Sequence, residues 1–282
     1  MAQHNIVHLY GTVQTEPNVT IDDETGKPIA ATLYLTVTNS ARKVDGVESP
    51  PEIIPVRVRA TSAETTCILA KAKLNDMVVI KGVVSTKNVI KQITCKECGQ
   101  RFSANSKEDN DSSEEATGMI TYVTPIAVDI MKSNLTEEEA MKHLLMVREM
   151  SNEVQLIGNL CADPKAWDNG KATAYQLGVN RKFYQIDDDP SIHADYPYVR
   201  AVGNQAENDI EALSKGSLVL VDGYLKMRYF DRKNVCPYCG ATRTWTDYAM
   251  ETVPYSVEYL ANFKTGKERL AEKEAQLEAY NF

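Results

Sequence analysis

A repeated pattern constrains this chain most, because its second half follows the first at a nearly constant spacing. The segment NIVHLYG at residues 5–11 recurs as NEVQLIG at residues 152–158, an offset of 147. Farther on, VVIKG at 78–82 matches VLVDG at 219–223 at an offset of 141. In both halves a Cys-x-x-Cys motif begins 13 residues after that glycine. Such a combination rarely recurs by chance, so the sequence predicts an internal duplication.

The length of 282 residues agrees with two domains of about 100–200 residues each. Hydrophobic residues make up 43% of the chain and charged residues 25%, as in ordinary globular proteins. The chain has no apolar run of about 18 residues and no signal-peptide pattern at its first residues, so we expect a cytoplasmic protein.

The net charge of -8 argues at first against a polyanionic partner. Five acids and one lysine fall within residues 105–118, however, which we interpret as a solvated acidic loop. Without this loop the remainder carries -8 + 4 = -4, so an acidic average is compatible with a local basic surface.

Strand-like alternation divides the second copy into five segments. We expect strands at about 152–161, 172–182, 196–203, 217–230 and 244–260, with a helix at Asn204–Ser214. Five strands with a helix after the third follow the order of an OB-fold, a five-stranded Greek-key barrel that commonly binds oligonucleotides. The sequence therefore predicts a mainly β protein of two tandem OB-folds with short helices.

The predicted domain boundaries follow from this repeat. Residues 1–131 form OB-fold domain 1 and residues 152–261 form OB-fold domain 2, called copy one and copy two below. Residues 132–151 form a helical linker that opens at a capping box of Thr136 and Glu139. Residues 262–282 are expected to form a charged C-terminal helix.

Four cysteines share a pattern that binds metal. Cys95 and Cys98 form one Cys-x-x-Cys-Gly motif, and Cys236 and Cys239 form the other. Each such turn directs two thiolates at one ion, and structural zinc takes four ligands in a tetrahedron. We expect one zinc ion to join the tips of the two long hairpins, either within one chain, which we favour, or across a dimer.

The main alternative for these motifs is dithiol redox chemistry, but neither lies in a thioredoxin-like βαβ context. The two remaining cysteines, Cys67 and Cys161, are expected to be small core residues.

Catalysis has little support in the sequence. The chain has no P-loop or dinucleotide-binding glycine motif, and its four histidines do not form a His-Glu-x-x-His site. A zinc ion closed by four thiolates leaves no position for a reactive water. We therefore expect a binding protein rather than an enzyme.

Copy two contains four collinear segments that belong together: NEVQLIGNLCADP (152–164), LGVNR (177–181), YVRAVGNQAE (198–207) and KGSLVLVDGYLKMR (215–228). Through them copy two resembles the bacterial-type single-stranded-DNA-binding protein family over most of its length. Copy one shows a weaker form. The resemblance implies OB-folds that bind single-stranded DNA in replication, recombination or repair, and a homodimer giving four OB-folds.

The resemblance also places stacking residues in copy two. Phe183, Tyr196 and Phe230 fall at the family's aromatic positions, while Val202 occupies a fourth. Basic and aromatic side chains interleave around them, as single-strand binding requires. The strand contacts expected in copy two are Phe183, Tyr196, Phe230, Arg181, Lys182, Tyr184, Arg200, Lys226, Arg228, Tyr229 and Arg232, with Trp167 and Trp245 near loops.

Copy one has no aromatic residue at the corresponding positions, which are about Arg42, Ile53, Arg59 and Val89. We expect it to supply phosphate contacts and little stacking, through Arg42, Lys43, Arg57, Arg59 and Lys87.

One departure from the family lies at the C-terminus. Family members usually end in a flexible tail with an acidic tip, whereas this chain ends QLEAYNF with one nearby acid. That form would suit a protein encoded by a phage or mobile element.

A second hypothesis for the whole chain is an OB-fold scaffold that binds protein partners, or single-stranded RNA, in a replication or mobile-element complex. In that case the aromatic residues would serve the core or an interface.

Overall fold

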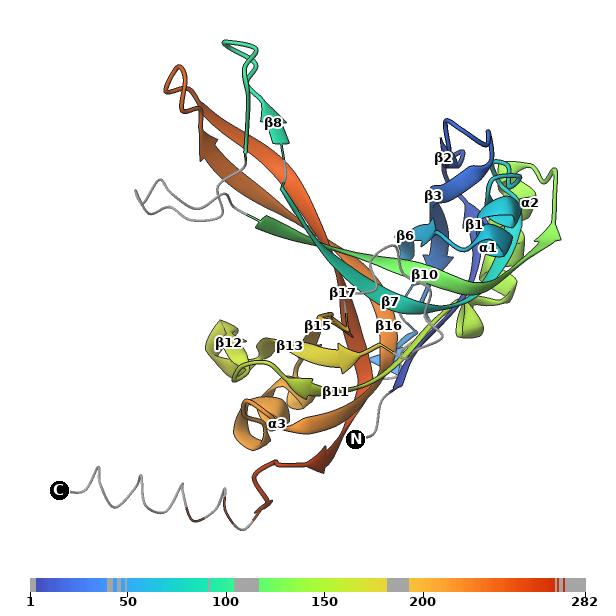
Figure 1. The fold of residues 1–282 in the computed structure, drawn as a ribbon. Coiled ribbons are helices and arrows are strands. Elements are labelled where there is room, and N and C mark those ends of the chain that lie inside the picture. The colour runs from blue at the N-terminus through green and yellow to red at the C-terminus, as the bar shows by residue number, and fades with distance from the viewer. Residues whose placement is uncertain are drawn as a thin grey trace.

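Each copy forms a five-stranded barrel in the computed structural model, which describes residues 4–39, 43–44, 47–48, 50–90, 92–103, 117–181, 193–266, 268 and 271. The barrel strands of copy one are β1 (His4–Val13), β3 (Pro28–Thr38), β6 (Ile53–Ala60), β7 (Met77–Ile90) and β10 (Thr117–Lys132). Those of copy two are β11 (Asn152–Leu160), β13 (Ala172–Asn180), β15 (Tyr198–Val202), β16 (Leu218–Val235) and β17 (Thr242–Ala261) (Figure 1).

The two barrels close in the same way. In copy one, β1 pairs with both β3 and β7, while β6 joins β3 to β10. In copy two, β11 pairs with both β13 and β16, while β15 joins β13 to β17. The third and fifth strands are parallel in each copy, and every other pairing in the ring is antiparallel. The predicted pair of tandem OB-folds is confirmed.

Strand alternation supplies the core of each barrel. Leu33 and Leu35 of β3 are buried, while Tyr34 between them is half-buried on the outer face. Val199 and Ala201 of β15 are buried in the same manner, with Arg200 between them on the outer face. Each strand therefore presents one apolar row to the barrel interior and one variable row outward.

The helices occupy the expected places. α1 (Ala63–Leu69) follows β6, and α3 (Asn204–Ala212) follows β15 within the predicted helical range. α2 (Glu137–Met146) links the copies and continues as the 3-10 turn η1 (Arg148–Met150). The predicted capping box is present, since Thr136 Oγ1 accepts from the Glu139 backbone N–H and the Glu139 carboxylate accepts from that of Thr136. Most of the predicted C-terminal helix lies outside the described residues.

Short strands complete the sheets. β2 (Asn18–Ile21), β12 (Lys165–Trp167) and β14 (Ala194–Asp195) extend the barrels, and the 3-10 turn η2 (Asp168–Gly170) follows β12. β4 (Lys43–Val44) pairs with β5 (Val47–Glu48), and β8 (Gln92–Thr94) pairs with β9 (Arg101–Ser103). The β16–β17 hairpin extends farther than the sequence predicts, because its ladder continues to the pair Val235–Thr242 beside the second cysteine motif.

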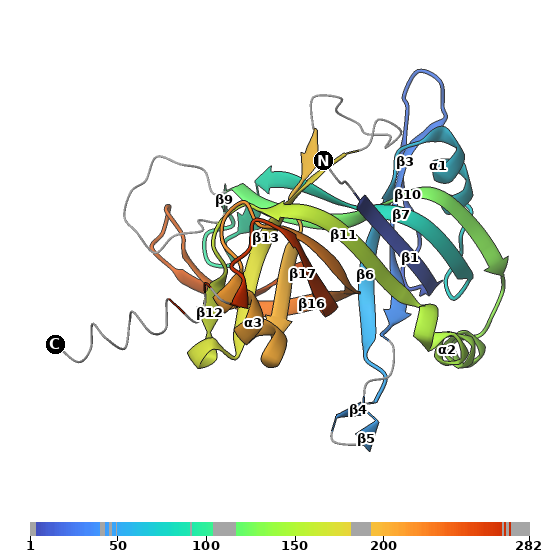
Figure 2. The same cartoon turned by 90° about the horizontal axis from the view of Figure 1, so that it is seen from below.

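The copies join through their first strands. β1 and β11 lie side by side (Figure 2). They pair antiparallel, with Asn5 opposite Leu156 and the equivalent Asn152 opposite the equivalent Leu9. The Asn5 side chain exchanges two 2.8 Å hydrogen bonds with the Val84 backbone, and Asn152 does the same with Leu225 at 2.8 and 3.0 Å. The copies are thus related by a pseudo-two-fold axis, and their sheets merge into one.

Two equivalent glycines allow the barrels to close. A Cβ atom on Gly11 would lie 2.7 Å from the Thr36 carbonyl oxygen, and one on Gly158 would lie 2.8 Å from that of Gly178. Both distances are too short for any side chain, so the repeated glycine is a packing requirement.

The prediction for Cys67 is wrong. Cys67 is exposed, because α1 directs Thr65, Thr66 and Leu69 toward the core and leaves position 67 on its outer side. Cys161 is half-buried. Within the described ranges, no helix has the length and apolarity needed to cross a membrane.

Candidate nucleic-acid interface and four-cysteine cluster

A groove of about 910 Å³ lies over the outer face of copy two. Its floor includes β13 and β15, with Gln176 and Tyr198 directly opposite each other. The β16–β17 hairpin contributes one side of the lining, and β12 contributes Lys165 and Trp167. Copy one also contributes, through Gly118, Met119 and Thr121 of β10, so the groove is built by both copies.

Aromatic side chains in this lining have room to contact a ligand. Trp167, at the end of β12, is 44% exposed, and Tyr198 and Tyr248 are each 41% exposed. Phe230 is half-buried, with the guanidinium carbons of Arg228 and Arg232 at 4.5 and 5.1 Å from its ring centre. An aromatic face and cationic groups therefore occur side by side.

The groove cations are partly neutralised by acids of β17. Arg228 Nε lies 2.7 Å from one Glu251 oxygen, and Arg200 Nη1 lies 3.7 Å from the other. Arg200 also lies 5.2 Å from the centre of the Trp167 ring. Arg232 Nε lies 2.9 Å from an Asp247 oxygen. The acids hold the arginines in place at the cost of some positive potential.

Six predicted strand-contact residues line this groove: Trp167, Arg200, Arg228, Phe230, Arg232 and Trp245. Tyr196 is exposed on the segment that leads into β15. Tyr229 is exposed on the hairpin face opposite to Phe230, and Lys226 forms an exposed ion pair of 2.9 Å with Glu52 of copy one.

Other predicted residues lie elsewhere. Lys182, Phe183, Tyr184 and Arg42 fall outside the described residues, and Lys43 is described only as part of β4. Arg57 and Arg59 lie on the outer face of β6, and Lys87 is exposed on β7.

The prediction for Arg181 needs correction. Its side chain is only 8% exposed and forms a two-pronged ion pair of 2.7 Å with Asp195, itself 1% exposed. A guanidinium held in this way serves the fold and presents little surface to a strand.

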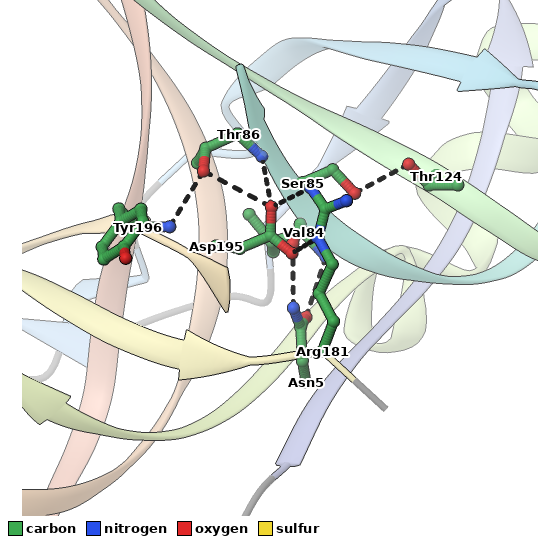
Figure 3. A network of polar contacts seen from close by, with 8 residues as sticks. All are labelled: Asn5, Val84, Ser85, Thr86, Thr124, Arg181, Asp195 and Tyr196. Carbon is green, nitrogen blue, oxygen red and sulfur yellow. Dashed lines mark hydrogen bonds and ion pairs between the residues drawn. The ribbon is translucent and has the colours of Figure 1, made fainter. Parts of the chain in front are cut away.

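The same carboxylate connects the two copies (Figure 3). Asp195 Oδ1 accepts a 2.7 Å hydrogen bond from the Thr86 backbone N–H of β7. Thr86 Oγ1 in turn accepts one of 2.9 Å from the Tyr196 backbone N–H. Copy one thereby fixes the backbone of a predicted stacking residue of copy two.

Sequence reasoning missed some residues of the groove. Tyr198 lies on the outer row of β15, and strand alternation alone would have placed it beside Arg200. No local signal identifies Met119, which reaches the groove from copy one and lies 3.6 Å from Gln176 Nε2 through its sulfur.

The four cysteines of the two motifs meet at the hairpin tips. Figure 1 shows β8 beside the end of the β16–β17 hairpin. Cys95 Sγ lies 3.7 Å from Cys239 Sγ, Cys98 Sγ lies 3.7 Å from Cys236 Sγ, and all four sulfurs lie within 4.8 Å of one another. The single chain therefore contains a complete four-thiol cluster with the geometry of a metal site.

Local structure prepares this cluster. Gly99 and Gly240 have φ values of 72° and 71°, which glycine adopts without strain, and each ends its turn. Backbone N–H groups of Cys98 and Glu97 lower the pKa of the Cys95 thiol to about 7. Phe102 and Trp245 pack around the cluster, and Trp245 Nε1 donates a 2.8 Å hydrogen bond to Asn234.

Comparison with known proteins points in one direction. Residues 151–250 match the model of the single-strand binding protein family. Single-stranded DNA-binding protein 3 of Clostridium acetobutylicum is 32% identical over 108 residues, covering 37% of this chain and 69% of that protein. Single-stranded DNA-binding protein 1 of Staphylococcus aureus (strain MSSA476) is 31% identical over 132 residues, covering 45% and 78%.

Single-stranded DNA-binding protein 2 of S. aureus (strain COL) is 39% identical over 87 residues, and the chain spans 61% of its length. Among solved structures, the wild-type single-stranded DNA binding protein from Thermus aquaticus aligns over 94% of this chain and 97% of its own, with a TM-score of 0.57 and 16% identity. A deletion mutant of the same protein aligns over 95% and 100%, with a TM-score of 0.56 and 18% identity. At such identity this likeness shows the fold alone.

Proposed function

We propose, on the premise that this chain belongs to the single-strand binding protein family, that it binds and protects single-stranded DNA with little sequence preference. The groove of copy two carries the proposal, because Trp167, Tyr198 and Phe230 alternate there with arginines. Bases of any sequence offer a π-face, and each stacked base contributes about 1–3 kcal/mol.

Charge contributes a second part of the binding free energy. Arg200, Arg228 and Arg232 lie beside the aromatic rings, where they can contact the phosphates of a strand whose bases stack. Since acids of β17 pair with these arginines, stacking is expected to supply more of the affinity than charge does. Binding of duplex DNA, whose bases are not free to stack, should be weak.

We also propose that the four-cysteine cluster holds one structural zinc ion. A zinc–sulfur bond of about 2.3 Å in a regular tetrahedron places sulfurs about 3.8 Å apart. The two sulfur separations of 3.7 Å agree with that value, and four thiolates are a preferred ligand set for zinc. The ion would join β8–β9 of copy one to β16–β17 of copy two and leave no position for catalysis.

Biological roles follow from the family and remain proposals. A strand-protecting protein serves DNA replication, recombination or repair, and its bacterial relatives support a cytoplasmic location. A homodimer with four OB-folds and an origin in a phage or mobile element stay predictions.

Fluorescence titration tests the proposed binding. Oligo-dT should quench tryptophan emission, because Trp167 lines the groove, and duplex DNA should not. Phe230→Ala should weaken oligo-dT binding about tenfold, and Phe230→Leu should weaken it similarly, since leucine keeps apolar volume but offers no π-face.

Tyr238→Ala is the matched control, because Tyr238 is an exposed aromatic outside the groove lining. No binding of oligo-dT by the wild-type chain at low salt would overturn the proposal in favour of the scaffold hypothesis. Tighter binding of oligo-U than of oligo-dT would make RNA the ligand.

A further inference from the structure

The registers of the two sheets relate the outer faces of the copies residue by residue. Thr32 pairs with Arg59 in copy one, as Ala174 pairs with Arg200 in copy two. Two residues farther along β3 and β13, on the same face of the sheet, Tyr34 pairs with Arg57 and Gln176 pairs with Tyr198. The pair Tyr34–Arg57 is therefore equivalent to Gln176–Tyr198, which lies on the floor of the groove.

This equivalence alters the expectation for copy one. The aligned stacking positions there lack aromatic residues, but an aromatic side chain is present on the neighbouring strand. Copy two has its tyrosine on the third barrel strand and an amide opposite; copy one has its tyrosine on the second and a guanidinium opposite. Each copy therefore has one tyrosine in this pair of equivalent positions.

The contact between copies repeats in the same way. In copy two, Gln176 contacts Met119 from the hairpin of copy one, at 3.6 Å. In copy one, the equivalent Tyr34 contacts Tyr248 from the hairpin of copy two, their hydroxyl oxygens 3.2 Å apart. The fifth-strand pairings of Val123 with Val58 and Thr252 with Val199 give an offset of 129, which relates Met119 to Tyr248.

The β16–β17 hairpin of copy two thus contacts the outer faces of both copies. Its register places Arg228 and Phe230 on one face, toward the groove. Tyr229 and Tyr248 are directly opposite each other in the hairpin, and Tyr248, which also lines the groove, meets Tyr34. Tyr229 is 60% exposed and Tyr248 41%, so both rings have surface available for stacking.

Basic residues lie on β6 and β7 of copy one. Arg57 lies across the strand pair from Tyr34, and its buried Nε atom has no hydrogen-bond partner among the described residues. Arg59 is on the same row of β6, and Lys87 is exposed on β7. The Arg57 side chain as a whole is half-buried, so the accessible part of its guanidinium can bind a phosphate oxygen.

We propose that Tyr34, Arg57, Tyr229 and Tyr248 form a second single-strand subsite, called the mixed-copy subsite, in which bases stack on tyrosines of both copies and a phosphate contacts Arg57. This inference rests on the proposed function and extends it: a strand that leaves the groove of copy two passes Tyr248 at the groove edge and continues onto Tyr229 and the outer face of copy one. Copy one then contributes stacking as well as charge.

Photo-crosslinking tests the subsite directly. The probe is an oligo-dT of about 30 nucleotides, longer than the roughly 4–16 nucleotides of one OB-fold site, with 5-iododeoxyuridine at single positions. Crosslinks are assigned to single residues, because Tyr229 and Phe230 are adjacent in the sequence, and crosslinks to Tyr34 or Tyr229 in addition to groove residues such as Phe230 are expected. Crosslinks confined to residues of the groove lining would overturn the subsite and leave the proposed function intact.

Affinity gives an independent measurement. Tyr229→Ala, at the most exposed ring, should weaken binding of the long oligo-dT about tenfold and shorten the length of strand that each chain occludes. Arg57→Gln should lower the salt dependence by about one phosphate contact. An unchanged affinity and occluded length in a folded Tyr229→Ala chain contradicts the subsite, whereas a wild-type chain that binds no oligo-dT contradicts the proposed function.

Discussion

The Thr86 backbone N–H donates a 2.7 Å hydrogen bond to Asp195, so a strand of copy one completes the environment of a buried carboxylate in copy two. Arg181 holds the same carboxylate through two further bonds of 2.7 Å. Because Thr86 also accepts from the Tyr196 backbone, the ion pair, the interface and a predicted stacking residue belong to one network.

Replacement of Asp195 by alanine tests this network. Because the buried Arg181 guanidinium would lose its carboxylate partner, the free energy of unfolding should fall by about 3–5 kcal/mol in urea denaturation. Glu52→Ala is the matched control, because its ion pair with Lys226 also joins the copies but both side chains are 40% exposed. That variant should lose at most about 1 kcal/mol. Equal losses would contradict a special role for the buried pair.

Glu251 is expected to restrain the affinity of the groove. It neutralises part of the charge of Arg228 and Arg200, which otherwise face phosphate. Glu251→Gln should therefore bind oligo-dT more tightly at low salt and show a steeper decrease in affinity with salt, by up to about 0.7 in the log–log slope for each added phosphate contact. Weaker binding would instead show that Glu251 is needed to position Arg228.

Metal removal should act on Trp245, which packs beside the cysteine cluster. The purified chain should contain one zinc ion, and its removal by a chelator should change tryptophan emission and lower the midpoint of thermal unfolding. Cys236→Ser should reproduce both effects. Cys67→Ser, at an exposed cysteine outside the cluster, should retain the metal. Metal analysis that finds no zinc in protein purified without chelator contradicts the site.

Asp209 should make stability depend on pH. Burial raises the pKa of this carboxyl above its ordinary value of 3.8, although Tyr259, Gln205 and Tyr175 donate hydrogen bonds to it. The folded chain then holds the proton more tightly than the unfolded chain. The stabilising contribution of Asp209 is therefore fully present below about pH 3.8 and is lost as the pH rises through its raised pKa.

The measurement compares wild-type and Asp209→Asn chains by urea denaturation across that pH range. The difference in unfolding free energy, wild type minus variant, should decrease as the pH rises, because the variant cannot titrate at this position. A difference that increases with pH would mean that the three hydrogen bonds outweigh burial.

The repeat, the cysteine motifs and the capping box were all predictable, because each is a signal of local spacing. Gly82 and Gly223 occupy equivalent positions beside a β-bulge in their hairpins, and the cysteines follow at a constant distance along the chain. Thr136 and Glu139 act within a single helical turn. Such features depend on short-range geometry that the sequence specifies directly.

The partners across the interface could not be predicted in the same way. Arg181 reads as a basic residue next to an aromatic run, and only the folded chain brings it to Asp195. Tyr34 reads as a core or surface residue of a strand, since its meeting with Tyr248 requires the placement of the two barrels. These contacts depend on how the two copies pack against each other, and strand alternation carries no information about that packing.

The antiparallel pairing of β1 with β11 has a consequence for the behaviour of the chain at low abundance. Two separate subunits joined by such an edge would part on dilution, whereas here the linker through α2 keeps the edges at a high effective concentration. The two-barrel unit therefore persists at any protein level. In a symmetric dimer of single barrels every substitution appears in both subunits, whereas here each barrel can change its surface independently. Tyr34 and Gln176, which occupy equivalent positions, are an example.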